Sequence, residues 1–169
     1  VVSQITYAGG DGSSGTPYQI ATLGQLLHLS ETPADWAAGI YFELTADIDA
    51  SATSTWNGGE GFSPIGNFGS PFLGDFNGNG HVITGLNINR PSQDHIGLFG
   101  YVSGNVERLG LDLLSVSGNA YVGGLAGEYH GTINSCYAAG SILGDVVVGG
   151  LVGINDGTMH SCYATCSVS

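Results

Sequence analysis

The chain has 169 residues, of which 30 are glycine and only 9% are charged. Its 14 acidic residues face two arginines and no lysine, and the resulting formal net charge of −12 excludes nucleic acid and anionic lipid surfaces as electrostatic partners. No apolar run approaches the roughly 18 residues of a membrane-spanning helix, so we expect no direct membrane insertion.

The opening stretch, VVSQITYAGG, lacks a positively charged segment followed by an apolar core, so we expect any export signal to have been removed or never to have been part of this sequence. Few charges and many Ser, Thr, Asn and Gly residues favour a secreted or cell-surface protein over a cytosolic enzyme. A chain of this length can bury a core of its own, so we treat residues 1–169 as a single domain. Within it, residues 1–50 form an N-terminal cap and first strand, 51–96 are diverged coils, and 97–169 are repeats.

Region 1–50 contains one predicted helix, a short amphipathic one over about residues 22–30. Thr22 suits the N-cap position, while Leu23, Leu26 and Leu27, together with Trp36, supply an apolar face. An open sheet edge invites pairing with other chains, so the end of a stacked fold needs a cover. We expect this helix to be that cover.

Two segments carry oxygen donors in calcium-like patterns. In DFNGNG, Asp75, Asn77 and Asn79 match the opening of a calcium loop, but Leu86 stands at the twelfth position, where a bidentate Glu is required. In TADIDAS, two aspartates share one face of a strand. We interpret the first as a glycine-rich corner turn and the second as solvated carboxylates. No cofactor is therefore predicted, with calcium at Asp75, Asn77 and Asn79 as the alternative.

Region 97–169 repeats itself. The tetrad G-L-x-G occurs at residues 97–100, 124–127 and 150–153, with spacings of 27 and 26, and GGLAGEYHGTINSCYAAGS returns as GGLVGINDGTMHSCYATCS. Gly104, Gly131 and Gly157 align in the same register. A diverged copy, GNGHVITGLNI, precedes them, and GIYFELTADIDAS is a candidate fifth copy.

Each copy has the pattern of short strands. Small apolar residues alternate with polar or aromatic ones, as in CYAAGSI, and the runs end at Gly or Asn/Asp-Gly. Such a unit cannot close a core alone, but stacked on its neighbour it buries a continuous apolar column, with strands about 4.8 Å apart. The sequence therefore predicts an all-β fold, a right-handed parallel β-helix of about four to five coils with a short N-terminal capping helix. The C-terminal copy shows no equivalent cap.

The cysteines fit this arrangement as core residues. Cys136 and Cys162 occupy one inward column on adjacent coils, so we expect their Cα atoms about 4.8 Å apart, which a disulfide permits. In-register side chains point the same way, however, which favours buried free thiols, with the disulfide as the alternative. Cys166 lies too far along its strand to bond with Cys162, which leaves it able to bond another molecule.

The tetrads followed by NSCYAAGS and HSCYATCS resemble the GLUG repeats of bacterial surface and secreted proteins. FSPIGNFGSPFLGDFNGNGHVITGLNI is similar to the segment that often precedes such repeats, and GGDGSSGTPYQIATLGQLLHL is similar to their N-terminal lead-in. The resemblance implies a parallel β-helix exported by a bacterium, commonly within an adhesin-like protein, and it supplies no catalytic residue. It departs from the family at Cys166, where the family has glycine. The residues assigned structural roles are Gly97, Gly100, Gly124, Gly127, Gly150, Gly153, Cys136 and Cys162.

We predict no catalytic residue and no metal site. The histidines never occur at a close metal-binding spacing such as H-x-x-x-H, which argues against zinc. A hydrolase site around His130 or His160, with Glu128, Asp156 or Ser161 nearby, lacks a nucleophile elbow. Polysaccharide-active β-helix enzymes are the enzymatic alternative, yet a lyase base is scarce here, and the aligned columns do not stack carboxylates. Those columns read Glu107, Asn134, His160 and Ser103, His130, Asp156.

Tyrosines provide the candidate binding residues. Tyr137 and Tyr163 should stack on neighbouring coils, with Tyr129 elsewhere on the surface, and exposed aromatic faces suit sugar rings and protein contacts. The alternative is that the stacked rings only stabilise the sheet. We therefore predict a non-enzymatic structural or adhesive module whose partners are a glycan or a host or cell-surface protein. The alternative partner is a second copy of the chain, joined head to tail through the end coils into a filament.

Overall fold

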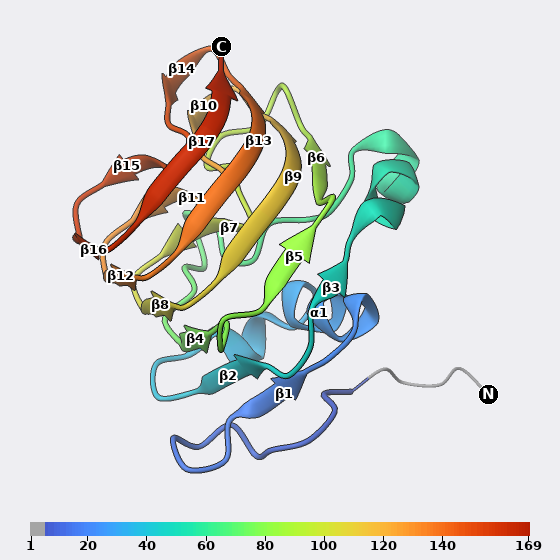
Figure 1. Cartoon of the computed structure of the whole chain (residues 1–169), viewed down its shortest axis with the longest axis vertical. Helices are drawn as coiled ribbons and strands as arrows, with labels where there is room; N and C mark the ends of the chain where they lie inside the picture. The colour runs from blue at the N-terminus through green and yellow to red at the C-terminus, as the bar shows by residue number, and fades with distance from the viewer. Residues whose placement is uncertain (1–5) are drawn as a thin grey trace.

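The computed structural model describes residues 6–169 and confirms the predicted parallel β-helix. Figure 1 shows the coils stacked from β1, drawn in blue near the bottom, to β17, drawn in red near the top. Strands of successive coils pair in parallel, as in the register of Tyr137 with Tyr163. Within the described residues, no helix has both the length and the apolar character that crossing a membrane requires.

Three sheets, named S1, S2 and S3, form the walls of the stack. S1 contains β1 (Tyr18–Ile20), β2 (Tyr41–Leu44), β4 (Asp75–Asn77), β8 (Asn105–Glu107), β12 (Thr132–Asn134) and β16 (Thr158–His160). S2 contains β3 (Ile48–Asp49), β5 (Val82–Thr84), β9 (Gly110–Ser117), β13 (Tyr137–Leu143) and β17 (Tyr163–Val168), with β6 (Asn87–Asn89) also paired to β9. S3 contains β7 (Phe99–Val102), β11 (Ala126–Tyr129) and β15 (Val152–Asn155). A short pair, β10 (Ala120–Val122) and β14 (Val146–Val148), lines the remaining edge.

The core is a set of vertical columns, because alternate residues of each strand point inward. In S1 the inward column runs through Phe42, Phe76, Val106 and Ile133, all at most 1% exposed. Aromatic rings fill the lower coils, where Phe76 meets Phe99 at a centroid distance of 5.5 Å. Smaller side chains, such as Ala126, Cys136 and Ala138, fill much of the upper coils beside the buried ring of Tyr129.

The aligned corner glycines are required by close approach of backbones. A Cβ on Gly131 would lie 1.8 Å from the carbonyl oxygen of Gly104, and one on Gly157 would lie 2.2 Å from that of Gly131. No side chain fits at such distances. The spacing of these glycines therefore reflects a corner at which successive coils touch directly.

The N-terminal region completes the stack. Helix α1 (Leu23–Ser30) begins where predicted, with Thr22 and Gln25 forming a capping box, and it buries Leu26 and Leu29 in the core. Two 3-10 helices follow, η1 (Pro33–Trp36) and η2 (Ser51–Gly59). Strand β1 is an additional strand that the sequence patterns do not predict. Its outer edge is covered by an antiparallel bridge between Gly9 and Gln19, so the helix shares the capping role with the segment that precedes β1.

One irregularity explains the change in repeat spacing. Asp112 and Leu113 of β9 together face the single residue Ala139 of β13, which makes a β-bulge. Leu113 takes a left-handed conformation, with φ 51°, and its side chain is 69% exposed. The extra residue is thus turned out to solvent, and the core columns continue on both sides of it.

The three cysteines are free thiols. Cys136 is 1% exposed in the core, while Cys162, just before β17, and Cys166, within β17, are partly exposed. Burial raises the pKa of the Cys136 thiol to about 12. Cys136 and Cys162 are therefore free thiols and do not form the alternative disulfide.

Candidate functional site

The outer face of S1 is hollowed into a groove of about 500 Å³. Because the inward residues of these strands form the core, the residues between them point outward and line up across coils. The outward-facing residues of S1 that line the groove are Tyr41, Glu43, Asp75, Asn77, Asn105, Glu107, Thr132 and Asn134, and Ser14 and Pro17 from the segment before β1 also line it. Three carboxylates and three amides thus face a single hollow that crosses β2, β4, β8 and β12.

Hydrogen bonds hold several groove side chains in place. The Gln19 amide donates to Glu43 Oε1 over 3.3 Å, and the Asn79 amide donates to Glu43 Oε2 over 3.0 Å. The Asn105 amide donates to Asp75 Oδ1. Neither arginine contributes to the groove lining, so its charge is entirely negative.

The alternative calcium residues serve the fold of this face. Asn77 Oδ1 accepts a hydrogen bond from the backbone N–H of Asn79, which closes a local turn. Asn79 Oδ1 accepts from the Arg108 guanidinium over 3.0 Å. A cation beside Asn79 would be repelled by that guanidinium. Figure 1 places this turn between β4 and β5, at the corner that joins S1 to S2.

The predicted column of Glu107, Asn134 and His160 is confirmed by the register of β8, β12 and β16. The structure extends this column downward through Asn77 to Glu43. The sequence repeats do not reveal this extension, because the lower coils are too diverged to align residue by residue.

Tyr137 and Tyr163 stack as predicted, with ring centroids 5.2 Å apart and planes only 5° from parallel. The other face of the Tyr137 ring covers Gly110, where an added Cβ would lie 2.6 Å from the ring. Both faces of Tyr137 are therefore occupied within the protein. Tyr163 is 58% exposed.

Tyr129 corrects the expectation of an exposed binding residue. It is 0% exposed, and the single hydrogen of its hydroxyl is shared between the carbonyl oxygens of Gly104, at 2.9 Å, and Thr132, at 3.0 Å. The cause is its position in β11, where it pairs with the buried Val102 and so points inward. Its role lies in the core.

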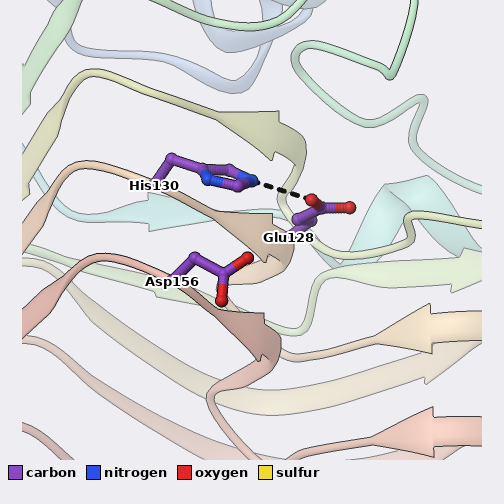
Figure 2. A group of neighbouring side chains, drawn as sticks. All are labelled: Glu128, His130 and Asp156. Atoms are coloured by element: carbon purple, nitrogen blue, oxygen red, sulfur yellow. Dashed lines mark hydrogen bonds and ion pairs between the residues drawn. The ribbon is translucent and has the colours of Figure 1, made fainter.

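A second polar cluster lies on the outer face of S3. Glu128 accepts two hydrogen bonds from imidazoles, from His95 Nε2 at 2.9 Å and from His130 Nε2 at 2.7 Å. Asp156 lies on the next coil, beside His130. Figure 2 shows Glu128, His130 and Asp156 gathered at the ends of neighbouring strands, with the imidazole of His130 directed at the Glu128 carboxylate.

Aromatic rings surround this cluster. Tyr101 stacks on His130 with centroids 5.0 Å apart and planes 18° from parallel, and Tyr121 lies 4.8 Å from His95. Phe68 packs against His95 while its own side chain is 73% exposed. Partial burial, with the negative charges of Glu128 and Asp156, raises the pKa of the Tyr101 hydroxyl.

The aspartates of TADIDAS each serve the local structure. Asp47 Oδ1 accepts from the backbone N–H of Val82 and lies 3.0 Å from His81 Nδ1, contacts that lower the pKa of its carboxyl. Asp49 accepts from Ser51 at the start of η2, which lowers its pKa in the same way.

Local spacing rules miss the S3 cluster. Its members are His95 in the segment before β7, Glu128 in β11, and His130 and Asp156 directly after β11 and β15, so no short motif contains all of them. The aligned column of Ser103, His130 and Asp156 does contain two of them, and the pairing of Tyr129 with Val102 and Asn155 puts that column in register. His95 and Glu128 occupy different positions of the repeat, so no aligned column pairs them.

Comparisons with known proteins add two sequence relatives. The chain is 39% identical over 138 residues to "Halomucin" from Haloquadratum walsbyi, and 40% identical over 134 residues to a "Putative Gly-rich membrane protein" from Evansella cellulosilytica. These alignments cover 79% and 76% of the chain but span only 2% and 15% of the lengths of the two relatives. No protein-family model matches the chain.

Among solved structures, the chain is similar to a "putative immunoglobulin A1 protease" from Bacteroides ovatus, with a TM-score of 0.70 and 22% identity. The likeness covers 95% of this chain and 50% of the other. It supports the β-helix fold.

Proposed function

We propose that the chain is a non-enzymatic β-helix module of an exported cell-surface protein and that it binds glycan in the groove on S1. The observation that carries this proposal is the groove itself, about 500 Å³ and lined by amides and carboxylates from four successive coils. Such side chains can accept from and donate to sugar hydroxyls, and Tyr41 offers an aromatic surface beside them.

The charge of the groove narrows the class of glycan. Glu43, Asp75 and Glu107 contribute negative charge, and no lysine or arginine lines the hollow. An acidic polysaccharide would be repelled at this surface. A neutral glycan is therefore the favoured ligand, with a protein partner as the alternative.

The absence of catalysis is part of the proposal. A lyase needs a base such as arginine or lysine beside its substrate, and the groove lining contains neither. Both oxygens of the Glu43 carboxylate already accept hydrogen bonds from amides, which suits a residue that orients a ligand. Turnover assays on neutral and acidic polysaccharides, with and without calcium, test this part directly, and release of reducing ends or unsaturated products would contradict it.

The surface location is supported by composition and by the names of the relatives. A chain with no lysine and 30 glycines is unusual for a cytosolic enzyme, and the relatives are described as a halomucin and a membrane protein. The GLUG assignment belongs to the same proposal and depends on the repeated tetrads. Head-to-tail self-association through the end coils is a separate hypothesis, which light scattering over a concentration series tests.

The experiment for the groove is a glycan-array screen followed by calorimetry with the best neutral glycan. We expect the double variant Glu107→Ala/Asn134→Ala to weaken binding at least about 10-fold, because each lost hydrogen bond to a ligand is worth about 1 kcal/mol. Both residues lie on the surface of the groove, so the variant should keep its fold by circular dichroism.

The matched control is Tyr137→Ala/Tyr163→Ala, which removes the other candidate binding surface. Unchanged affinity in this control, with loss in the groove variant, supports the groove. Loss in the tyrosine variant alone would move the site to the stacked rings, and the absence of any glycan signal for the wild type would overturn the glycan proposal.

A further inference from the structure

We propose that Glu128, His130 and Asp156 form a binding site for a divalent transition-metal ion such as zinc. One donor atom from each residue, an imidazole nitrogen and two carboxylate oxygens, lies within 4.8 Å of the other two. The site is on S3, separate from the groove on S1. The metal proposal therefore goes beyond the proposed glycan function and does not depend on it.

The fold brings the three donors together through register. Tyr129 pairs with Asn155, so the residues that follow them, His130 and Asp156, emerge side by side from adjacent coils. Glu128 precedes His130 by two residues and therefore points to the same face of its strand. Metal–donor bonds of about 2.0–2.2 Å need donors somewhat closer than 4.8 Å, which rotation of the exposed Asp156 side chain supplies.

The charges at this site lack a fixed positive partner. Within residues 6–169, the ion-pair contacts of Glu128 are with imidazoles only. The two arginines are committed elsewhere, Arg90 to Glu60 at 3.1 Å and Arg108 to Asn79 at 3.0 Å. Two carboxylates on a chain of net charge −12 therefore stand where a bound cation would be favourable.

Neighbouring residues hold two of the donors in position. His95 Nε2 donates to Glu128 Oε2 and so leaves Oε1 facing His130. Tyr101 stacks on the His130 ring and restricts its rotation. On binding, the metal takes the place of the hydrogen on His130 Nε2, and the neutral ring then carries its hydrogen on Nδ1 after exchange with solvent. His95 is thus a positioning residue for the carboxylate ligand.

The donor set selects the class of ion. Imidazole nitrogen suits zinc, cobalt, nickel and copper, whereas calcium takes six to eight oxygen ligands. With one nitrogen and two carboxylates, the site leaves at least one coordination position for water or an external ligand.

The test is calorimetric titration of the untagged chain with zinc chloride, with cobalt absorption in the visible range as an independent report of coordination. We expect about one zinc per chain, and at least about 10-fold weaker binding in each of the variants His130→Gln and Asp156→Asn. Both residues are exposed, and equal urea midpoints would verify that the variants stay folded.

His160→Gln is the matched control, since His160 is an exposed imidazole on S1. It should leave the zinc affinity unchanged, and a large excess of calcium should not displace the ion. The proposal is overturned if the wild type binds zinc no more tightly than the His130 and Asp156 variants, if His160→Gln weakens binding as much as they do, or if calcium displaces the zinc.

Discussion

At the scale of single residues, the aligned corner positions require glycine because the backbones of successive coils touch there. The corner glycines stack so closely that the backbone of one coil occupies the space a side chain would need on the next. This differs from the turn glycines, such as Gly39, whose left-handed φ of 83° is what favours glycine there. A repeat alignment alone does not separate the two reasons.

Gly131→Ala should therefore be strongly destabilising. Its Cβ would meet the Gly104 carbonyl oxygen at 1.8 Å, which forces the coils apart, and we expect a loss of about 3 kcal/mol in the free energy of unfolding measured with urea. Gly15→Ala is the control, because nothing lies within 4 Å of its added Cβ. A change of less than about 0.5 kcal/mol is expected there. Equal effects of the two substitutions would contradict the contact explanation.

At the same scale, the burial of Tyr129 shows how the face of a strand decides the role of an aromatic residue. An aromatic residue in a repeat is as suited to the core as to a binding surface, and the choice depends on which face of the strand it occupies. Its partner in the register, Val102, decides the matter, since both are buried. The neighbouring Glu128 occupies the opposite face, and this places it in the S3 cluster.

At the scale of elements, the β-bulge in β9 lets coils of unequal length stack. The unpaired Leu113 adopts φ 51° and exposes most of an apolar side chain, so it gains little from burial and carries backbone strain. The strain is local because the flanking pairs, Leu111 with Ala138 and Leu114 with Gly140, stay in place.

Leu113→Asn should stabilise the protein by about 1 kcal/mol, because asparagine tolerates the left-handed conformation better than leucine. Thermal unfolding of the two proteins measures the difference. Leu143→Asn serves as the control, since Leu143 is 54% exposed in β13 without a positive φ. If both substitutions raise the melting temperature equally, the gain comes from removing exposed apolar surface and the strain argument fails.

At the scale of the whole molecule, the stack makes the burial of equivalent residues unequal along its axis. Cys136 and Cys162 belong to one column, yet Cys136 is sealed between coils while Cys162 is partly exposed on β17's coil. Reactivity should therefore vary along the column, although the local sequence is nearly the same.

Thiol labelling tests this gradient. Cys136 is 1% exposed, and its pKa of about 12 leaves almost no thiolate at neutral pH, so we expect it to react only when the protein unfolds. Cys162 and Cys166 should react first in a native-state assay with an aromatic disulfide. In a Cys162→Ala/Cys166→Ala variant the fast phase should vanish, and rapid labelling of that variant would contradict the burial of Cys136.

The S3 cluster marks the limit of prediction from local patterns. Metal-binding motifs such as H-x-x-x-H join residues a few positions apart, whereas a β-helix brings together side chains that are one repeat period apart. Reading the aligned columns pairs His130 with Asp156, but His95 and Glu128 occupy different positions of the repeat on neighbouring coils, so no aligned column contains their contact.

The sequence by itself determined the fold class, the register of the upper coils, the helix at its N-terminal end and the burial of Cys136. It could do so because parallel stacking places equivalent residues of successive copies about 4.8 Å apart, so any spacing that fails to align them exposes the core. Only the tertiary structure decided that Tyr129 points inward, that β1 adds a strand to S1, and that polar side chains of separate coils converge on the groove and on the S3 cluster. Those outcomes depend on the face each short strand presents and on the path of the diverged coils, and both are set by packing between segments far apart in the chain.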